Sequence, residues 1–257
     1  MKKIAPFFLI IVAVILSLFI YQSVMDNKQE EAVLFPLTNS ELKTISIDTN
    51  GNEYVIANQA LTDFIFDELQ IETSSLLTQD AVVKDTIQLT FNESVSFQYF
   101  KDETNQYYLQ QEDGHLFKAN QVNYLLPLDQ LLDDYSMEDA KSDHLTVFVH
   151  DEHENFEVMT SFLEMIEENQ AAFIRYGSLT IEGDLILTDI YFTEAITDAQ
   201  IDTTRDTFSA SPKIESYQFE HLSVADHLEY SYLIGYDGEF EASMIEDNQV
   251  TILARVR

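Results

Sequence analysis

An uninterrupted apolar run near the N-terminus constrains this chain more than any other feature. Residues 4–21 carry no charged side chain, and Lys2 and Lys3 stand directly before them. As an α-helix the run would be about 27 Å long, close to the thickness of the hydrocarbon core of a bilayer. The run therefore predicts a single transmembrane helix. The two lysines predict a cytoplasmic N-terminus, with the rest of the chain extracytoplasmic.

Two other roles are known for apolar N-terminal segments, a cleaved signal peptide and a lipoprotein signal. A cleaved signal peptide has a shorter apolar region and a small-residue cleavage site, whereas residues 22–26 read Gln-Ser-Val-Met-Asp. A lipoprotein needs a cysteine to carry its lipid, and the chain has none. We therefore expect an uncleaved signal anchor over residues 1–23, a lipid bilayer as the partner of residues 4–21, and a polar stalk over 24–35. The expected location is the cell membrane, single-pass, and cleavage stays open as the alternative.

Charge restricts the partners of the remaining chain. There are 46 acidic and 13 basic side chains, which gives a formal net charge of −33. Nucleic acid is excluded as a partner because phosphate binding requires clustered Lys and Arg. The acidity indicates either a cationic or protein partner, or adaptation to salty or alkaline surroundings, and the even spread of the acids favours the second. The lack of cysteine excludes disulfides, thiol catalysis and thiolate metal sites.

Turn signals and apolar periodicity predict short strands and two helices. Asn-Gly or Asp-Gly pairs, which favour tight hairpin turns, stand at 50–51, 113–114 and 237–238. Asn58 precedes a run with Leu61, Phe64, Ile65 and Leu69 at helical spacing, and Asn155 precedes a second such run over 156–166.

These elements predict an α+β fold. We expect an N-terminal transmembrane helix followed by two mainly antiparallel-sheet modules, each with a packed helix, because short turns join neighbouring strands. The modules would cover residues 36–135 and 144–257. A charged linker over 136–143 would separate them.

One pattern in the second half is similar to a known family. Arg175 lies in a strand-like run that leads into Thr-Ile-Glu-Gly-Asp at 180–184, and Asp-Thr-Thr-Arg-Asp-Thr-Phe follows at 202–208. Over about residues 144–250 the chain resembles a domain of unknown function found in small extracytoplasmic lipoproteins of low-GC Gram-positive bacteria. Leu179 and Leu185 stand where that family usually has tyrosine and proline, and the lipid-bearing cysteine is missing. The resemblance implies an extracytoplasmic location and no established activity.

The Glu-Gly-Asp core could bind a cation or form a turn. Glu182 and Asp184 flank Gly183, and Asp206 could add further oxygens, so these three acids are the candidate metal ligands. The alternative is a β-turn in which glycine adopts a backbone angle that other residues avoid. We favour the turn and predict no metal or cofactor.

The chain has only four arginines, and two of them lie in this pattern. An arginine on an apolar strand of so acidic a chain predicts a structural ion pair, and bidentate pairing explains arginine rather than lysine. We expect Arg175 and Arg205 to pair with Glu182, Asp184 or Asp206. Recognition of an anionic ligand is the alternative.

Two further clusters have a structural and a functional interpretation. His150-Asp151-Glu152-His153-Glu154, with His144 nearby, could ligate a transition metal, but the residues lack helical His-x-x-x-His spacing and suit a solvated loop. The aromatic residues at 97–100 and 107–108 suit the core of a sheet, or an exposed strip that binds glycan or peptide.

The function predicted from these patterns is binding rather than catalysis. The sequence shows no nucleophile elbow, phosphate-binding glycine loop or Ser-His-Asp order. We therefore expect a membrane-anchored extracytoplasmic protein that acts as a non-catalytic binding or interaction module at the cell surface. The alternative is a cation-dependent enzyme or cation-binding module that uses the acidic residues of the second module.

Overall fold

The computed structural model describes residues 36–37, 41–49, 51–56, 58–71, 84–112, 114–131, 133–149, 152–241, 243–247 and 249–256. The strands are β1 Ile45–Thr49, β2 Asn52–Ile56, β3 Lys84–Phe91, β4 Val95–Lys101, β5 Tyr107–Gln110, β6 Leu116–Ala119, β7 Thr146–Val149, β8 Glu152–Glu154, β9 Ala172–Leu179, β10 Leu185–Phe192, β11 Thr197–Asp202, β12 Ile214–Phe219, β13 His221–His227, β14 Tyr230–Tyr236 and β15 Thr251–Arg255. The α-helices are α2 Gln59–Leu69, α3 Met137–Ser142, α4 Phe156–Glu167 and α5 Ser243–Glu246. Two short 3-10 helices are η2 Asn123–Leu125 and η3 Leu128–Gln130.

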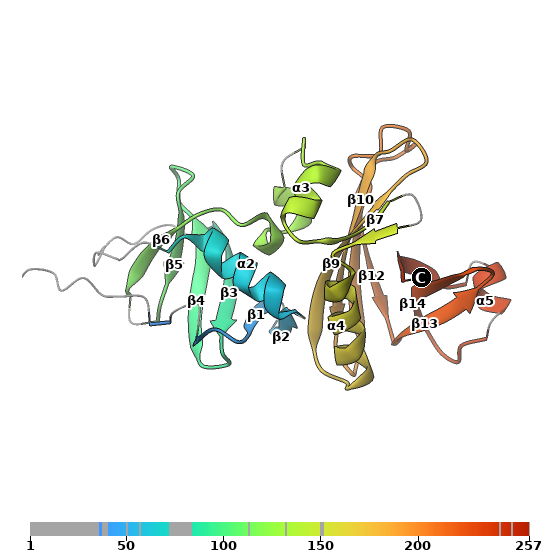
Figure 1. Cartoon of the computed structure of the whole chain (residues 1–257), viewed down its shortest axis with the longest axis horizontal. Helices are drawn as coiled ribbons and strands as arrows, with labels where there is room; N and C mark the ends of the chain where they lie inside the picture. The colour runs from blue at the N-terminus through green and yellow to red at the C-terminus, as the bar shows by residue number, and fades with distance from the viewer. Residues whose placement is uncertain are drawn as a thin grey trace, which may run out of the picture.

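One twelve-stranded mixed sheet runs through both halves of the chain (Figure 1). Its main path is β12-β11-β10-β9-β2-β1-β3-β4-β5-β6, with β7 and β8 off this path. Nearly all neighbours are antiparallel, but β9 pairs in parallel with both β2 and β7. The β2–β9 pairing, Val55 with Ala172 and Ile56 with Phe173, is the seam that joins the two halves.

Local sequence accounts for the two longer helices. The Asn58 side chain accepts a hydrogen bond from the backbone N–H of Leu61 and so caps α2, as its position predicted. Leu61, Ile65 and Leu69 are fully buried on one face of α2. In α4, Asn155 precedes the first turn in a left-handed conformation, with φ of 53°, and its side chain makes no capping bond. Its side-chain amide donates to the carbonyls of Lys141 and Leu145.

Two of the three predicted glycine-containing hairpin turns form, whereas Gly238 follows β14 and leads toward α5 rather than into a paired strand. Gly51 and Gly114 have positive φ, at 79° and 88°, and each stands between two paired antiparallel strands. Asp48 accepts a hydrogen bond from the backbone of Gly51 and tightens the first of these hairpins. The partner residues of the predicted pairs at positions 50 and 113 lie outside the described residues.

A small three-stranded sheet of β13, β14 and β15 packs against the end of the large sheet. Phe219 of β12 lies directly over Gly235 of β14, where a Cβ would stand only 2.3 Å from the ring. Leu222, Leu233 and Leu253 belong to the same buried cluster as the large sheet. Through these residues the small sheet joins the main core, whereas Ala225 and Ile234 form a second, smaller cluster with Ile245 of α5.

The predicted α+β fold of two separate antiparallel modules is wrong. Strand residues outnumber helical residues in the described part of the chain, and a single mixed sheet with one main core includes strands from both halves. Turn signals predict pairing between neighbours in sequence, whereas the β2–β9 pairing joins strands more than a hundred residues apart. The boundaries at 36–135 and 144–257 stay a prediction, and the predicted linker over 136–143 contains α3.

The membrane assignment is also corrected. Within the part of the chain that the structure describes, no helix is both long and apolar enough to cross a bilayer. The residues on which the assignment depended, 1–35, lie outside the described residues. The predicted transmembrane signal anchor and single-pass location at the cell membrane are therefore without structural support.

Candidate functional site

Arg175 lies in the middle of β9 and is almost completely buried, at 1% exposure. Its Nε donates to Oδ1 of Asp189 at 2.6 Å, and its Nη2 donates to Oδ2 at 2.7 Å. The guanidinium also donates to the backbone carbonyls of Asn123 and Leu126, at 2.9 and 2.7 Å. Burial by itself lowers the pKa of Arg175, but the charge and hydrogen bonds of Asp189 outweigh it and raise the pKa above its ordinary value. The Arg175 guanidinium therefore links the sheet to the η2–η3 segment through its hydrogen bonds.

The carboxylate partner of Arg175 differs from the three that the sequence predicted. Asp189 stands directly opposite Arg175 in the β9–β10 register, whereas Glu182 and Asp184 lie in the connecting turn. A signal for this was present in the sequence. A hairpin centred on residue 182 places position 175 opposite position 189. The expectation that one of the three predicted acids pairs with Arg175 is wrong because the strand register places Asp189 opposite it.

Arg205 pairs with Asp202, the last residue of β11. One of its Nη atoms forms an ion pair with Oδ2 of Asp202, and both side chains are buried. Oδ1 of the same aspartate accepts from the backbone N–H and the hydroxyl of Thr204, at 2.8 and 2.6 Å. The guanidinium of Arg205 also lies 5.9 Å from the ring centre of Tyr135. This arrangement fixes the start of the β11–β12 loop.

The Glu-Gly-Asp core forms the turn between β9 and β10. Gly183 has φ of 96° and donates from its backbone to the carbonyl of Thr180 at 3.0 Å. Glu182 is exposed at the turn. Oδ2 of Asp184 accepts from the backbone N–H and the hydroxyl of Thr207, at 2.8 and 2.7 Å. The aspartate therefore ties this hairpin to the β11–β12 loop.

Asp206, the third candidate metal ligand, stabilises the β11–β12 loop by a hydrogen bond. Oδ1 of Asp206 accepts from the backbone N–H of Phe208 at 3.0 Å. Asp184 and Arg205 line one open hollow of about 370 Å³, together with Asp133, Asp134 and Tyr135, whereas Glu182 and Asp206 do not line it. Among the described residues no group of three or more His, Asp or Glu side chains is placed to hold a metal ion.

The histidine-rich segment does not form a cluster in its described part. His150 and Asp151 lie outside the described residues. His153 stands between the rings of Phe148 and Phe156, with ring centres 5.0 and 4.7 Å away. His144 stacks on Phe64 of α2 at 4.4 Å. Both rings have aromatic neighbours, which is the packing expected of structural histidines.

Four of the five aromatic residues of β4 and β5 are core residues, Tyr108 is half-buried, and three of the four, Tyr99, Phe100 and Tyr107, also line a cavity. Phe97, Tyr99, Phe100 and Tyr107 are each at most 6% exposed. Tyr99 and Tyr107 stack on each other with ring centres 5.3 Å apart. The Tyr99 hydroxyl donates to the carbonyl of Asn120 at 2.8 Å. They are thus not an exposed strip.

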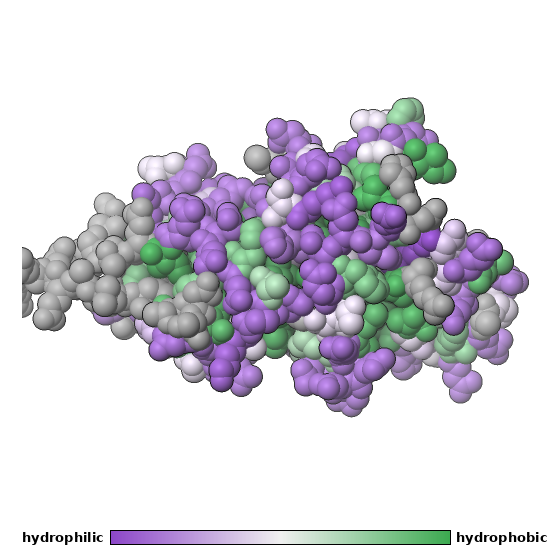
Figure 2. Space-filling view, in the orientation of Figure 1, coloured by the Kyte–Doolittle hydropathy of each residue, from purple (hydrophilic) through white to green (hydrophobic). Residues whose placement is uncertain are grey.

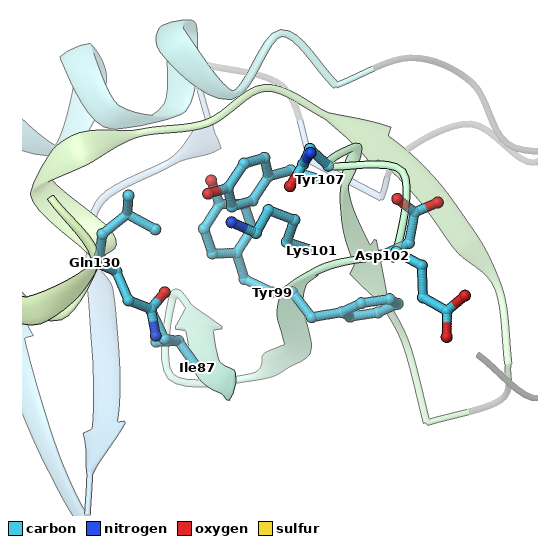
Figure 3. A pocket seen from close by; sticks show the side chains of 10 residues that line it. Ile87, Tyr99, Lys101, Asp102, Tyr107 and Gln130 are labelled. Atoms are coloured by element: carbon cyan, nitrogen blue, oxygen red, sulfur yellow. The ribbon is translucent and has the colours of Figure 1, made fainter. Parts of the chain in front are cut away.

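The cavity beside these rings has a volume of about 480 Å³ (Figure 3). It lies where β4 ends, and Figure 3 shows Lys101 in front of the two tyrosines, with Ile87 and Gln130 on the opposite side. We call it the aromatic cavity; its lining residues are Ile87, Tyr99, Phe100, Lys101, Asp102, Glu103, Asn105, Tyr107, Leu126 and Gln130.

The polar groups of the aromatic cavity divide into two sets. Asp102 holds the β4–β5 loop closed: its Oδ1 accepts from the backbone and hydroxyl of Thr104 and from the backbone of Gln106. These hydrogen bonds lower the pKa of Asp102. Glu103 and Gln130, by contrast, make no side-chain hydrogen bond to any residue that the structure describes.

Sequence reasoning identified the aromatic residues of this cavity and missed its polar rim. Gln130 and Leu126 come from the η2–η3 segment, which the hydrogen bonds of Arg175 hold against the sheet. Lys101 could have been noticed, because it is one of only 13 basic residues and follows directly on the aromatic run. Comparisons with family models, curated proteins and solved structures find no match to this chain, so the family resemblance of residues 144–250 stays a prediction.

Proposed function

We propose that this protein is a non-catalytic binding module and that its ligand occupies the aromatic cavity. The observation that carries the proposal is the composition of the cavity: a mainly apolar floor of Ile87, Phe100 and Leu126 with a few polar side chains at its rim. A concave site of this size, with a few convergent polar groups, is the usual form of a small-ligand site.

The disposition of hydrogen bonds favours binding over catalysis. The Asp102 carboxylate and the Tyr99 hydroxyl, which could act as acid or base, are engaged in structural hydrogen bonds. The Lys101 ammonium lies 5.8 Å from the ring centre of Tyr107. The groups that remain for a ligand are one ammonium, one carboxylate and two carboxamides, which can donate and accept hydrogen bonds.

The shape of the site favours an extended ligand. A second hollow of about 190 Å³ shares Ile87 and Leu126 with the aromatic cavity and continues toward Arg175, Tyr191 and Gln200. An apolar floor with amide and carboxylate groups at the rim suits a neutral chain rich in hydroxyl or amide groups. A short glycan or a short peptide has this chemistry.

The test is calorimetric titration of the full-length protein with panels of neutral oligosaccharides and neutral peptides. The cavity variant Glu103→Ala/Gln130→Ala should weaken the binding of an active compound about thirtyfold, since two hydrogen bonds of about 1 kcal/mol each are lost. Gln111→Ala/Glu112→Ala, on the β5–β6 hairpin outside the aromatic cavity, is the matched control and should bind normally. Equal weakening by both variants, or no binding in either panel, would contradict the proposal.

A further inference from the structure

Two large apolar side chains are exposed on two loops that are tied together. Ile181, in the β9–β10 turn, is fully exposed, and Phe208, in the β11–β12 loop, is 72% exposed. The two hydrogen bonds from Thr207 to Asp184 join the turn to the loop. We call the residues 180–184 and 203–213 the two-loop tip. None of these residues lines the aromatic cavity.

Internal hydrogen bonds order the β11–β12 loop that carries Phe208. The backbone N–H of Thr203 donates to the carbonyl of Lys213 at 3.0 Å, which closes the base of the loop. Asp206 accepts from the backbone of Phe208 next to the exposed ring. The ring is therefore presented by a fixed backbone, so little conformational entropy is lost when a partner covers it.

The surroundings of these apolar residues are acidic. Figure 2 shows hydrophobic atoms at the end of the two loops among hydrophilic ones. Glu182 follows Ile181 in the turn, and the exposed Asp133 and Asp134 line the adjoining hollow with Asp184. Both cations of the tip are already paired within the protein, Arg205 with Asp202 and Lys213 with Glu215.

We propose that the two-loop tip is a docking surface for a partner protein segment in which a large apolar side chain stands beside lysine or arginine. The apolar side chain would cover Ile181 and Phe208, and the cations would face Glu182, Asp133 and Asp134. Aromatic and aliphatic anchors with a charged rim are the usual composition of such interfaces. A second copy of the chain, with a net charge of −33, or an anionic lipid surface would be repelled.

The absence of tryptophan in this protein permits a direct assay. The probe is a synthetic peptide in which lysines alternate with leucines around one tryptophan, and its fluorescence is followed during titration with the full-length protein. Saturable binding is expected, and it should weaken as salt screens the charges. The tip variant Ile181→Ser/Phe208→Ser should bind at least about tenfold more weakly.

A matched control separates docking at the tip from general attraction to an acidic protein. Leu228→Ser removes an equally exposed apolar side chain, 88% exposed, from the β13–β14 hairpin and should bind like the native protein. A peptide with glutamate in place of lysine should not bind. Should the tip variant fold poorly, Glu182→Gln/Asp134→Asn tests the charge contribution without changing the apolar side chains.

Four results would overturn the proposal. The first two are an absence of binding and equal binding by the native and tip-variant proteins. The third is equal binding of the glutamate peptide. The fourth is self-association of the native protein that the tip variant abolishes, because the occupant would then be a second copy of the chain.

Discussion

Arg175 and Asp189 stand opposite each other on β9 and β10, and both carboxylate oxygens of Asp189 accept hydrogen bonds from the guanidinium inside the core. Both residues are at most 1% exposed. Because the same guanidinium holds the carbonyls of Asn123 and Leu126, the pair also positions the segment that supplies Leu126 and Gln130 to the aromatic cavity.

Removal of one member of this pair should strongly destabilise the protein. Asp189→Ala leaves a buried guanidinium without its counter-charge, and we expect the free energy of unfolding to fall by about 3–5 kcal/mol. Urea denaturation measures this change. The double variant Arg175→Met/Asp189→Leu should be more stable than Asp189→Ala. Lys213→Met, which breaks an exposed ion pair with Glu215, should leave stability nearly unchanged.

A methyl group at position 235 should destabilise the packing of the small sheet against the large one. In Gly235→Ala the new Cβ would overlap the ring of Phe219, whose nearest atom is 2.3 Å away. Overpacking of this kind costs about 1–3 kcal/mol, which thermal or urea unfolding would detect. In a Phe219→Ala background the same substitution should cost much less, because the ring is gone. If the losses in free energy of unfolding of the two single variants simply add in the double variant, the contact between Phe219 and position 235 is contradicted.

The β13–β14 hairpin should be stabilised by a residue suited to its backbone. Leu228 has φ of 56°, a left-handed conformation that costs an ordinary residue about 1–2 kcal/mol. Leu228→Asn should therefore raise the free energy of unfolding by about 1 kcal/mol, since asparagine adopts this conformation more readily. Leu228→Ala is the control: it removes the exposed side chain but keeps the unfavourable backbone angle, so it should not stabilise.

Stability should decline in mild acid because of His153. Neither of its ring nitrogens has a hydrogen-bond partner among the described residues. Burial lowers the pKa of His153, and the positive charge of Arg255 lowers it further. Below about pH 6.5 the unfolded chain takes up a proton at this position that the folded chain takes up only at lower pH, so stability is present above pH 6.5 and falls below it.

Urea denaturation at a series of pH values compares native protein with His153→Phe. The variant should lose less stability than the native protein as the pH falls from neutrality into this window. His221→Gln, which changes an exposed ring, should follow the native profile. Parallel profiles for native protein and His153→Phe would show that His153 makes no contribution.

Much of the local structure was predictable because it depends on neighbouring residues. The capped helix 59–69 follows from Asn58 and the spacing of its apolar residues, and the turns at Gly51 and Gly114 follow from their backbone freedom. The site was less predictable. The aromatic residues of β4 and β5 were recognised, but Gln130 reaches them only through tertiary packing.

By itself, the sequence determined the capped helix 59–69 and the glycine turns, and it identified Glu182, Gly183 and Asp184 as a turn. Only the tertiary structure decided that β2 joins β9, that Arg175 donates to the carbonyls of Asn123 and Leu126, and that the two loops meet through Asp184 and Thr207. The physical reason is the separation along the chain of the residues that interact. Periodicity and turn chemistry act over a few residues, whereas these pairings depend on how distant segments bury a shared core.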